Sequence, residues 1–286
     1  MTQTPILIAD SGSTKTDWLL LAPEGEAKSL QTAGLNPYML ADADIDALLR
    51  NRLLPALPEA QGADVRFYGA GCRGEQCGRL VGLLGRALSA TSVEVESDLL
   101  GAARALCGNE AGWACILGTG SNSCLYDGQK IETNVPPLGY VLGDEGSGAA
   151  LGKRLVADAM KGLLPADLQQ AFEAECRTTL DELLRRVYRE AAPNRYLAGF
   201  APFLHHHRKH PAVASMLHEE FTRFFRRNLR SKAGGCHTVH FVGSIACFFA
   251  EEVGRAAAAE GFATGRILRS PIDGLRLFHG KNRENS

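Results

Sequence analysis

The chain has 286 residues, of which 45% are hydrophobic and 22% are charged, a composition typical of a soluble globular protein with room for two modest domains. Its formal net charge of −1 argues against a nucleic-acid-binding surface. No apolar stretch is long enough to cross a bilayer and no signal peptide is recognised, so we expect a cytoplasmic protein with no membrane partner.

The first predicted element is a β-hairpin around residues 10–17, whose sequence is Asp-Ser-Gly-Ser-Thr-Lys-Thr-Asp. Short apolar runs of buried-strand type flank it, at 6–9 and 18–21. Its small residues offer backbone N–H groups and hydroxyls to an anion, although an ordinary tight hairpin has the same pattern. Asp10 favours the anion-binding interpretation, because a carboxylate that ends a buried strand is costly unless a charged group meets it. Mg²⁺ on a polyphosphate is such a group.

The remainder of the first half alternates helices and strands. We expect helices at 42–54, 78–88 and 99–106, and strands at 65–68 and 93–96. A hairpin followed by this alternation favours an α/β fold, in which a mixed sheet is covered by helices.

The second half opens with another strand–turn–strand pattern. Apolar residues 113–117 precede the small polar turn 118–123, and a strand resumes at 124–126. This recurrence indicates a distant internal duplication, in which each half has its own anion-binding turn. A glycine-rich loop at 139–148 follows. The later pattern predicts a helix at 149–160, a mostly helical stretch at 167–232, a strand at 239–242, a helix at 245–259, a strand at 267–269 and a short terminal helix from Pro271.

Four glycine-containing turns follow apolar strands or lie close to them, at residues 10–16, 118–123, 143–147 and 243–244. Chance turns would account for any one of them. In an α/β sheet, however, turns at the strand ends cluster where ligands bind, so the set predicts a shared nucleotide cleft.

Asp98 follows the strand at 93–96 and opens a helix, so its ordinary role would be that of an N-cap. In a nucleotide cleft it is instead a candidate general base. Phosphoryl transfer to a hydroxyl needs an acceptor for the hydroxyl proton, and such a group typically contributes about 10²- to 10⁴-fold in rate.

Metal-binding alternatives are weaker. The histidine run invites a metal interpretation, but its members point to different helix faces and no carboxylate or cysteine lies at ligand spacing nearby: His205, His206, His207 and His210. We therefore interpret the run as a solvated helix end. The eight cysteines include no C-x-x-C pair, which favours buried thiols over a zinc site or a disulfide framework. A basic run shares a helix with three phenylalanines and should face water: Arg223, Arg226, Arg227, Arg230 and Lys232.

Five motifs occur in a specific order: Asp-Ser-Gly-Ser-Thr-Lys-Thr at 10–16, Ser-Asp-Leu-Leu-Gly-Ala at 97–102, Leu-Gly-Thr-Gly-Ser-Asn at 117–122, Gly-Asp-Glu-Gly-Ser-Gly at 143–148 and Val-Gly-Ser-Ile at 242–245. Together they resemble the BadF/BadG/BcrA/BcrD-type ATPase family, and within it the N-acetylglucosamine kinase branch. The resemblance extends from about residue 5 to Leu275. It implies the actin-like ATPase fold of sugar kinases, with two ribonuclease H-like domains around a nucleotide cleft. The implied domains are residues 1–108, with the first phosphate motif and the sugar side, and residues 109–286, with the second phosphate motif, the adenosine motif and a helical insertion.

The resemblance also implies an ATP-dependent kinase that converts an amino sugar, N-acetylglucosamine, to its 6-phosphate, with ATP and Mg²⁺ as cofactors. Asp10 would orient the Mg²⁺, and Asp98 would be the catalytic base. The residues implied to contact ATP are Ser11, Gly12, Ser13, Thr14, Lys15, Thr16, Gly118, Thr119, Gly120, Ser121, Gly243 and Ser244. Those implied to contact the sugar are Asn36, Asp98, Asn122 and Asp144. Among oligomeric states, we consider a homodimer for this protein.

One departure from the family pattern affects the sugar. The mammalian N-acetylglucosamine kinases have Gly-Trp-Gly-His before Gly-Asp-Glu-Gly-Ser, whereas this chain has Pro-Leu-Gly-Tyr-Val-Leu at 137–142. Glucosamine and N-acetylmuramic acid therefore stay open as acceptors. So do two other functions: a non-catalytic sugar sensor, and an ATPase activator of an acyl-CoA reductase or dehydratase. The activator would need paired exposed cysteines for an iron–sulfur cluster, and Cys72 and Cys77 are the only close pair in the sequence.

Overall fold

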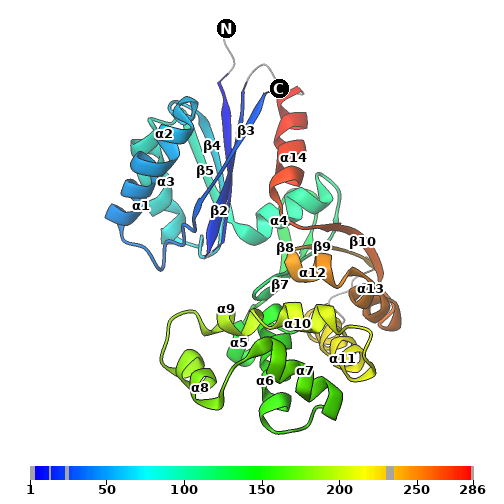
Figure 1. Cartoon of the computed structure of the whole chain (residues 1–286). Coiled ribbons are helices and arrows are strands. Elements are labelled where there is room, and N and C mark those ends of the chain that lie inside the picture. The colour runs from blue at the N-terminus through cyan, green and yellow to red at the C-terminus, as the bar shows by residue number, and fades with distance from the viewer. Residues whose placement is uncertain (1–3, 13, 23–25, 230–234, 285–286) are drawn as a thin grey trace. The chain divides into compact units, whose positions relative to one another are not determined.

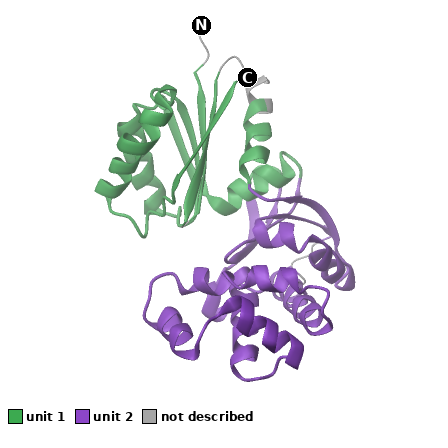
Figure 2. Cartoon of the chain, in the orientation of Figure 1, with its two compact units in different colours: residues 1–110, 128–130, 271–286 green, residues 111–127, 131–270 purple. Residues whose placement is uncertain are grey.

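The computed structural model describes residues 4–12, 14–22, 26–229 and 235–284, with the backbone alone at 281–284. The chain folds into two compact units (Figure 1). Figure 2 shows unit 1, residues 1–110, 128–130 and 271–286, and unit 2, residues 111–127 and 131–270. The expected division after residue 108 lies close to the first of these boundaries. The segment from 271, however, is part of unit 1, whereas the sequence placed it in the C-terminal domain.

Unit 1 is built on a mixed five-stranded sheet. Its strands are β1 (Ile6–Ser11), β2 (Lys15–Leu21), β3 (Ala27–Ala33), β4 (Asp64–Gly69) and β5 (Ser92–Ser97), in the spatial order β3-β2-β1-β4-β5. β1, β2 and β3 are antiparallel neighbours, whereas β4 runs parallel to β1 and β5 runs parallel to β4. The predicted hairpin and mixed sheet are thus confirmed. The sequence did not predict β3, because this edge strand is polar and mostly exposed.

Helices cover both faces of this sheet (Figure 1). One face packs against α1 (Asp42–Leu48), which continues through a π-helical segment (Leu49–Leu53) into α2 (Leu54–Ala56) and a 3₁₀ turn (Pro58–Ala60), and against α3 (Glu75–Leu88). The other face packs against α4 (Asp98–Cys107) and α14 (Ile272–Glu284). Because successive strand residues point to opposite faces, Leu7 and Ala9 join the first core and Ile8 joins the second.

The terminal helix α14 is held to unit 1 by close packing and by a buried polar link. Gly274 lies so close to Ala105 of α4 that a Cβ at residue 274 would collide with it. The Tyr68 hydroxyl lies 2.9 Å from Nε2 of His279 and accepts a hydrogen bond from Arg104 at 2.7 Å. Burial and the nearby arginines lower the pKa of His279 to about 4, so this buried imidazole is neutral at physiological pH. These contacts explain why the terminal segment belongs to the first unit.

The sheet of unit 2 repeats the topology of unit 1. Its strands are β6 (Gly112–Leu117), β7 (Ser121–Tyr126), β8 (Ile131–Val135), β9 (Thr238–Val242) and β10 (Ala263–Leu268), in the order β10-β9-β6-β7-β8. β6, β7 and β8 are antiparallel neighbours, whereas β9 runs parallel to β6 and β10 runs parallel to β9. The two sheets match strand for strand, which confirms the predicted internal duplication. As with β3, the polar edge strand β8 was not predicted.

The helices of unit 2 enclose an aromatic core. They are α5 (Gly139–Leu142), α6 (Gly148–Met160), α7 (Ala166–Cys176), α8 (Leu180–Tyr188), α9 (Pro193–Ala198), α10 (Ala201–His206), α11 (Pro211–Asn228), α12 (Ser244–Phe248) and α13 (Ala250–Ala259). The helix predicted at 245–259 is in fact two helices, which meet at the buried Phe249.

The basic run on α11 behaves as predicted. Phe221, Phe224 and Phe225 are fully buried, whereas the described arginines of the run have more than half of their side-chain surface exposed: Arg223, Arg226 and Arg227. Arg230 and Lys232 lie outside the described residues.

Two expectations about the whole chain can also be compared with the structure. Within the ranges given above, no helix is both long enough and apolar enough to span a bilayer. Burial of the thiols is confirmed for half of the cysteines, namely Cys72, Cys107, Cys115 and Cys124.

Candidate active site

Two carboxylates lie at the same edge of the unit 1 sheet. Ser11 of β1 is opposite Gly69 of β4, and Gly69 is opposite Ser97 of β5. The carboxyl ends of these three parallel strands are therefore level. This brings Asp10, near the end of β1, to the same edge as Asp98, directly after β5, which is the edge where α/β proteins bind ligands.

Asp10 is electrostatically unfavourable as a carboxylate when nothing is bound. Burial, followed by the negative charges of Asp98 and Asp17, raises the pKa of Asp10 to about 7, while Lys15 acts in the opposite direction. A cation at this position would favour the ionised form. Mg²⁺ prefers oxygen donors and is usually bound through one or two carboxylates, so this group of residues fits Mg²⁺.

Asp98 is the first residue of α4 and is not its N-cap. The cap is Ser97, whose hydroxyl accepts the Leu100 N–H at 3.2 Å. One carboxylate oxygen of Asp98 accepts the Leu99 N–H at 2.9 Å. Burial raises the pKa of Asp98, although that hydrogen bond and the charge of Arg73 partly offset the effect. The N-cap alternative is therefore wrong, and a carboxylate with a raised pKa is suited to accept a proton.

The hydroxyls of Ser11 and Thr16 are used inside the fold. Both residues are fully buried, and their Oγ atoms lie 2.8 Å apart. The Leu35 N–H donates to the two hydroxyls, at 2.9 Å and 3.2 Å. They attach the loop after β3 to the hairpin. Both hydroxyls therefore have partners within the fold, and a phosphate contact at Ser11 and Thr16 stays a prediction.

The exposed part of the first hairpin turn is smaller than the motif. Gly12, Thr14 and Lys15 are exposed, and the Gly12 N–H closes the turn by donating to the Lys15 carbonyl at 2.9 Å. The Lys15 ammonium lies 2.8 Å from the carboxylate of Asp17. Ser13 lies outside the described residues. Among the described residues of this turn, the surface offered to an anion is therefore Gly12, Thr14 and Lys15.

Asn36 lies at the carboxylate-bearing edge of unit 1. Its side-chain oxygen accepts the Tyr38 N–H at 3.0 Å, which makes a local turn. The same oxygen packs against Gly71, which follows β4. The predicted sugar-contacting residues of unit 1, Asn36 and Asp98, therefore belong to segments that meet at one edge.

In unit 2, the turn between β6 and β7 packs against the loop before α6. The Ser121 N–H donates to Asp144 Oδ1 at 3.2 Å, and Gly120 lies against the same carboxylate. The Gly148 N–H donates to the Gly118 carbonyl at 2.9 Å. Burial raises the pKa of Asp144, and the hydrogen bond from Ser121 partly offsets it. The fold thus brings the second predicted phosphate turn and Asp144 together.

The loop before α6 is anchored to α11 through Glu145. The Glu145 carboxylate is buried, forms an ion pair with Arg227 and accepts a hydrogen bond from Asn228 Nδ2 at 3.4 Å. Gly146 packs against Phe224 of α11. Because a buried carboxylate is costly without its counter-charge, Arg227 helps to fix the loop that carries the neighbouring aspartate.

Asn122 lies in β7, one residue beyond the turn. Its side-chain oxygen accepts the Ser123 N–H at 2.9 Å and a hydrogen bond from Asn134 Nδ2 at 3.0 Å. A sugar contact through this oxygen would have to replace one of these bonds.

A cavity of about 420 Å³ opens beside the β6–β7 turn, wholly within unit 2. Its lining combines Gly118 and Thr119 of the turn with Pro202 of α10 and with Ser244 and Phe248 of α12. This volume, with mostly apolar walls and a few polar groups, is typical of a small-molecule site. The second predicted phosphate turn and the predicted adenosine motif therefore adjoin one space.

Gly243 allows that arrangement. It has φ of +124°, and a Cβ there would overlap the Leu117 carbonyl oxygen at the end of β6. A side chain would therefore force β6 and β9 apart, and Ser244 would move away from the turn.

Several cavity residues were not predicted from the sequence. Arg195 and His205 reach the cavity from α9 and α10, and the His205 ring packs 5.6 Å from the rings of both Phe248 and Phe249. The sequence had assigned these segments only to a helical insertion and a solvated helix end. The sequence carried no signal for them, because their place beside Phe248 and Phe249 depends on how α9 and α10 pack against α12.

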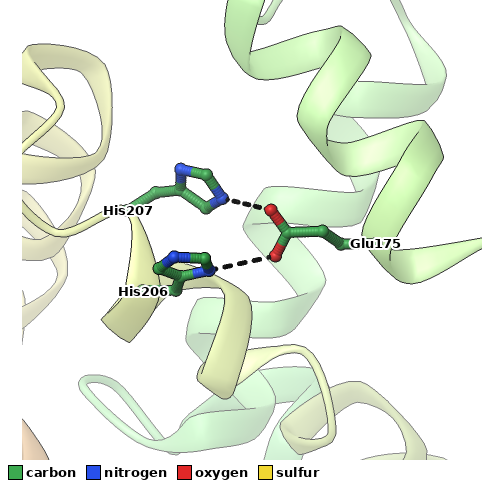
Figure 3. A group of neighbouring side chains, drawn as sticks. All are labelled: Glu175, His206 and His207. Carbon is green, nitrogen blue, oxygen red and sulfur yellow. Dashed lines mark hydrogen bonds and ion pairs between the residues drawn. The ribbon is translucent and has the colours of Figure 1, made fainter.

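The positions of the remaining histidines differ from the expectation that no carboxylate lies near the run. His206 and His207 both face Glu175 of α7 (Figure 3). His210 caps the beginning of α11. The expectation that no carboxylate lies near the run is wrong, because the fold places the end of α7 against the end of α10.

No protein-family model matches the chain, so the BadF/BadG/BcrA/BcrD label stays a resemblance, and no curated protein matches it either. A solved structure of a proposed N-acetylglucosamine kinase from Porphyromonas gingivalis is 45% identical, covers 97% of this chain and 99% of that chain, and has a TM-score of 0.92. A proposed N-acetylglucosamine kinase from Chromobacterium violaceum has 16% identity, covers 97% and 99%, and has a TM-score of 0.77.

A more distant match confirms the predicted fold class. A ROK-family glucokinase from Streptomyces griseus, solved with glucose and AMPPNP, has 13% identity, covers 94% of this chain and 95% of that chain, and has a TM-score of 0.55. The shared fold is the actin-like ATPase fold of sugar kinases. Because the Porphyromonas gingivalis protein is 45% identical over nearly the full length of both chains, the chain belongs to its family, that of proposed N-acetylglucosamine kinases.

Proposed function

We propose that the protein is an ATP-dependent kinase that phosphorylates an amino sugar, N-acetylglucosamine, at its 6-hydroxyl. The observation that carries the proposal is the cavity of unit 2, which is lined by Gly118 and Thr119 of the β6–β7 turn and by Ser244. The resemblance implies a phosphate role for the first of these segments and an adenosine role for the second, and a shared space of this size supports binding of one nucleotide by both. The acceptor is proposed from the 45% identical relative.

On the nucleotide side, we assign the adenosine to this cavity and the phosphates to the glycine turns. Phe248 and Ser244 would contact the nucleoside, while Thr119 and Gly120 would supply backbone N–H groups to the phosphates. In unit 1, the exposed Gly12, Thr14 and Lys15 are the proposed contacts to the terminal phosphates, and Ser13 completes the motif. Ser11 and Thr16 are proposed to shape the turn, because their hydroxyls are buried.

We assign Asp10 to Mg²⁺. The group that would gain most from a cation at this edge is the Asp10 carboxylate, which is crowded by Asp98 and Asp17. When bound, Mg²⁺ supplies neutralisation of the charge that develops on the transferred phosphoryl group.

Asp98 is the proposed general base. Its carboxylate would accept the proton of the sugar 6-hydroxyl while that oxygen forms a bond to the γ-phosphorus and the bond from this phosphorus to the β,γ-bridging oxygen breaks, leaving ADP. Burial raises its pKa, which makes it a stronger base than an exposed carboxylate.

The sugar contacts proposed are Asn36 and Asp98 in unit 1 and Asn122 and Asp144 in unit 2. The segment 137–142, which differs from the mammalian sequence, includes the short helix α5 just before the loop of Asp144. Glucosamine and N-acetylmuramic acid therefore remain alternative acceptors.

The test is a phosphorylation screen with Mg·ATP across N-acetylglucosamine, glucosamine, N-acetylmuramic acid and glucose. Product is identified by mass spectrometry and ADP release by a coupled assay. N-acetylglucosamine is expected to give the 6-phosphate at the highest kcat/KM. The matched control is Asp98→Asn, which should bind ATP and give almost no product. Wild-type protein that binds ATP but phosphorylates none of the sugars would support the sensor function instead.

We also propose that the enzyme acts in the cytoplasm on free sugar and that it forms a homodimer. Light scattering at micromolar concentration tests the dimer, and a monomer mass would refute it.

A further inference from the structure

Glu175, His206 and His207 converge on the surface of unit 2, and none of them has a role in the proposed kinase reaction (Figure 3). His207 Nε2 lies 2.7 Å from Glu175 Oε1, and His206 Nδ1 lies 3.3 Å from Glu175 Oε2. One nitrogen or oxygen atom from each residue lies within 4.8 Å of the other two. The group is accessible, because the His206 side chain is 72% exposed and that of Glu175 is 38% exposed.

The end of α10 explains how two consecutive histidines reach one carboxylate. Consecutive residues inside a helix point about 100° apart. His206 is the last residue of α10, however, and His207 is its C-cap, with φ of −95° and ψ of 16°. The rings are therefore free to tilt toward each other, with centroids 4.6 Å apart, and both turn toward α7.

The atoms present are those that a zinc-type ion prefers. Two imidazole nitrogens and a carboxylate oxygen are typical donors to Zn²⁺ and to neighbouring transition metals, whereas Mg²⁺ prefers oxygen alone. Ligand atoms at about 2.0–2.1 Å from a tetrahedral ion lie about 3.3 Å apart. The two nitrogen–oxygen distances, 2.7 Å and 3.3 Å, are at or below that value, so the three side chains are already close enough to share one ion after a small adjustment.

A simple hydrogen-bonded pair provides the contrast. His210 Nε2, at the N-cap of α11, lies 3.3 Å from the carboxylate of Asp167 in the first turn of α7, but this pair offers one imidazole only. The other group offers two imidazoles to one carboxylate.

We propose that Glu175, His206 and His207 form a surface binding site for one zinc-type transition-metal ion, with water completing its coordination. The site uses no cysteine, and it is independent of the kinase proposal. A bound ion would join the end of α7 to the end of α10, the helix whose other residues Pro202 and His205 line the cavity.

The experiment uses the full chain without a histidine tag, treated with a chelator and then dialysed. Zn²⁺ is titrated by calorimetry in millimolar Mg²⁺, and Co²⁺ is titrated by visible absorption. We expect one ion per chain, a Co²⁺ spectrum of low coordination number, and a thermal midpoint that rises with free Zn²⁺. Glu175→Gln and His206→Asn should each weaken Zn²⁺ binding by about tenfold or more.

Two matched variants complete the design. His210→Asn removes a nearby imidazole, and Cys176→Ser removes the thiol beside Glu175; both should keep the wild-type affinity. Circular dichroism and kinase activity with Mg·ATP should be unchanged in all four variants, because the altered side chains lie at the surface or at its margin. The proposal is overturned if wild-type protein takes up no Zn²⁺, if Glu175→Gln binds as tightly as wild type, or if Cys176→Ser abolishes binding.

Discussion

Replacing Asp10 by Asn is expected to stabilise the metal-free protein while impairing its use of Mg·ATP. In the folded chain, burial and the charges of Asp98 and Asp17 raise the pKa of Asp10 from 3.8 to about 7. At pH 8 the folded protein therefore carries an unfavourable charge, which Asn removes with little change in size or shape. Stability and function should thus change in opposite directions at this one position.

The magnitude follows from the linkage between protonation and folding. A shift from 3.8 to about 7 is about 3 pKa units, or about 4 kcal/mol as an upper bound, at about 1.36 kcal/mol per unit. Below about pH 4 the aspartate is protonated in both states, and the variant gains nothing. As the pH rises through this window, the unfolded chain loses its proton first, so the wild type becomes progressively less stable than the variant. Above about pH 7 the difference is constant, and we expect about 1–4 kcal/mol because local relaxation reduces the cost.

The assay is urea and thermal unfolding in EDTA at pH 4.5, 6 and 8, with the Mg²⁺ dependence of sugar phosphorylation measured in parallel. Asp46→Asn is the control, because it makes the same charge change at an exposed carboxylate paired with Arg50 and should stay within about 0.5 kcal/mol of wild type. The reasoning is refuted if Asp10→Asn is less stable than wild type at pH 8, or if its advantage does not grow between pH 4.5 and pH 8.

Three other substitutions test the site. Asp98→Asn should lower kcat by about 10²-fold or more while calorimetry shows nearly unchanged ATP and sugar binding, and a near-normal kcat would remove Asp98 as the base. Gly243→Ala should abolish ATP binding in calorimetry, because its Cβ would overlap the Leu117 carbonyl and its φ of +124° is strained for alanine; wild-type ATP affinity would contradict this. Arg227→Met should lower the free energy of unfolding in urea by about 1–3 kcal/mol, because it removes the cation that pairs with the buried Glu145 carboxylate. Water partly replaces the exposed arginine, which keeps the loss moderate. Adding Glu145→Gln should recover most of the loss.

The sequence predicted the features that depend on local pattern. Apolar runs around small-residue turns predicted both hairpins and hence the duplicated sheet. Short strands and tight turns depend mainly on residues that are neighbours in the sequence. The polar edge strands β3 and β8 were missed, because they bury one face only in part and lack that pattern.

The candidate site was less predictable than the fold. The pairing of Ser11 with Thr16 depends on which strand face each occupies after folding, so the motif alone does not predict which of its hydroxyls are buried. The contact of Glu175 with His206 joins residues far apart in the chain, and the cavity likewise needs α10 beside α12. The spacing of residues along the sequence does not predict which separate helices will lie in contact.

The return of α14 to unit 1 determines the order in which the protein can be completed during synthesis. Unit 2 lies almost entirely within residues 111–270, so its whole sequence has been translated before the terminal segment is added. Unit 1 begins first, yet the sheet face that carries Ile8 and Tyr68 is covered by α4 but lacks its second helix until α14 has been synthesised. A chain cut short before α14 would therefore damage the N-terminal sheet with its two carboxylates and leave the cavity of unit 2 intact. Unit 1 is therefore begun before unit 2 but completed after it.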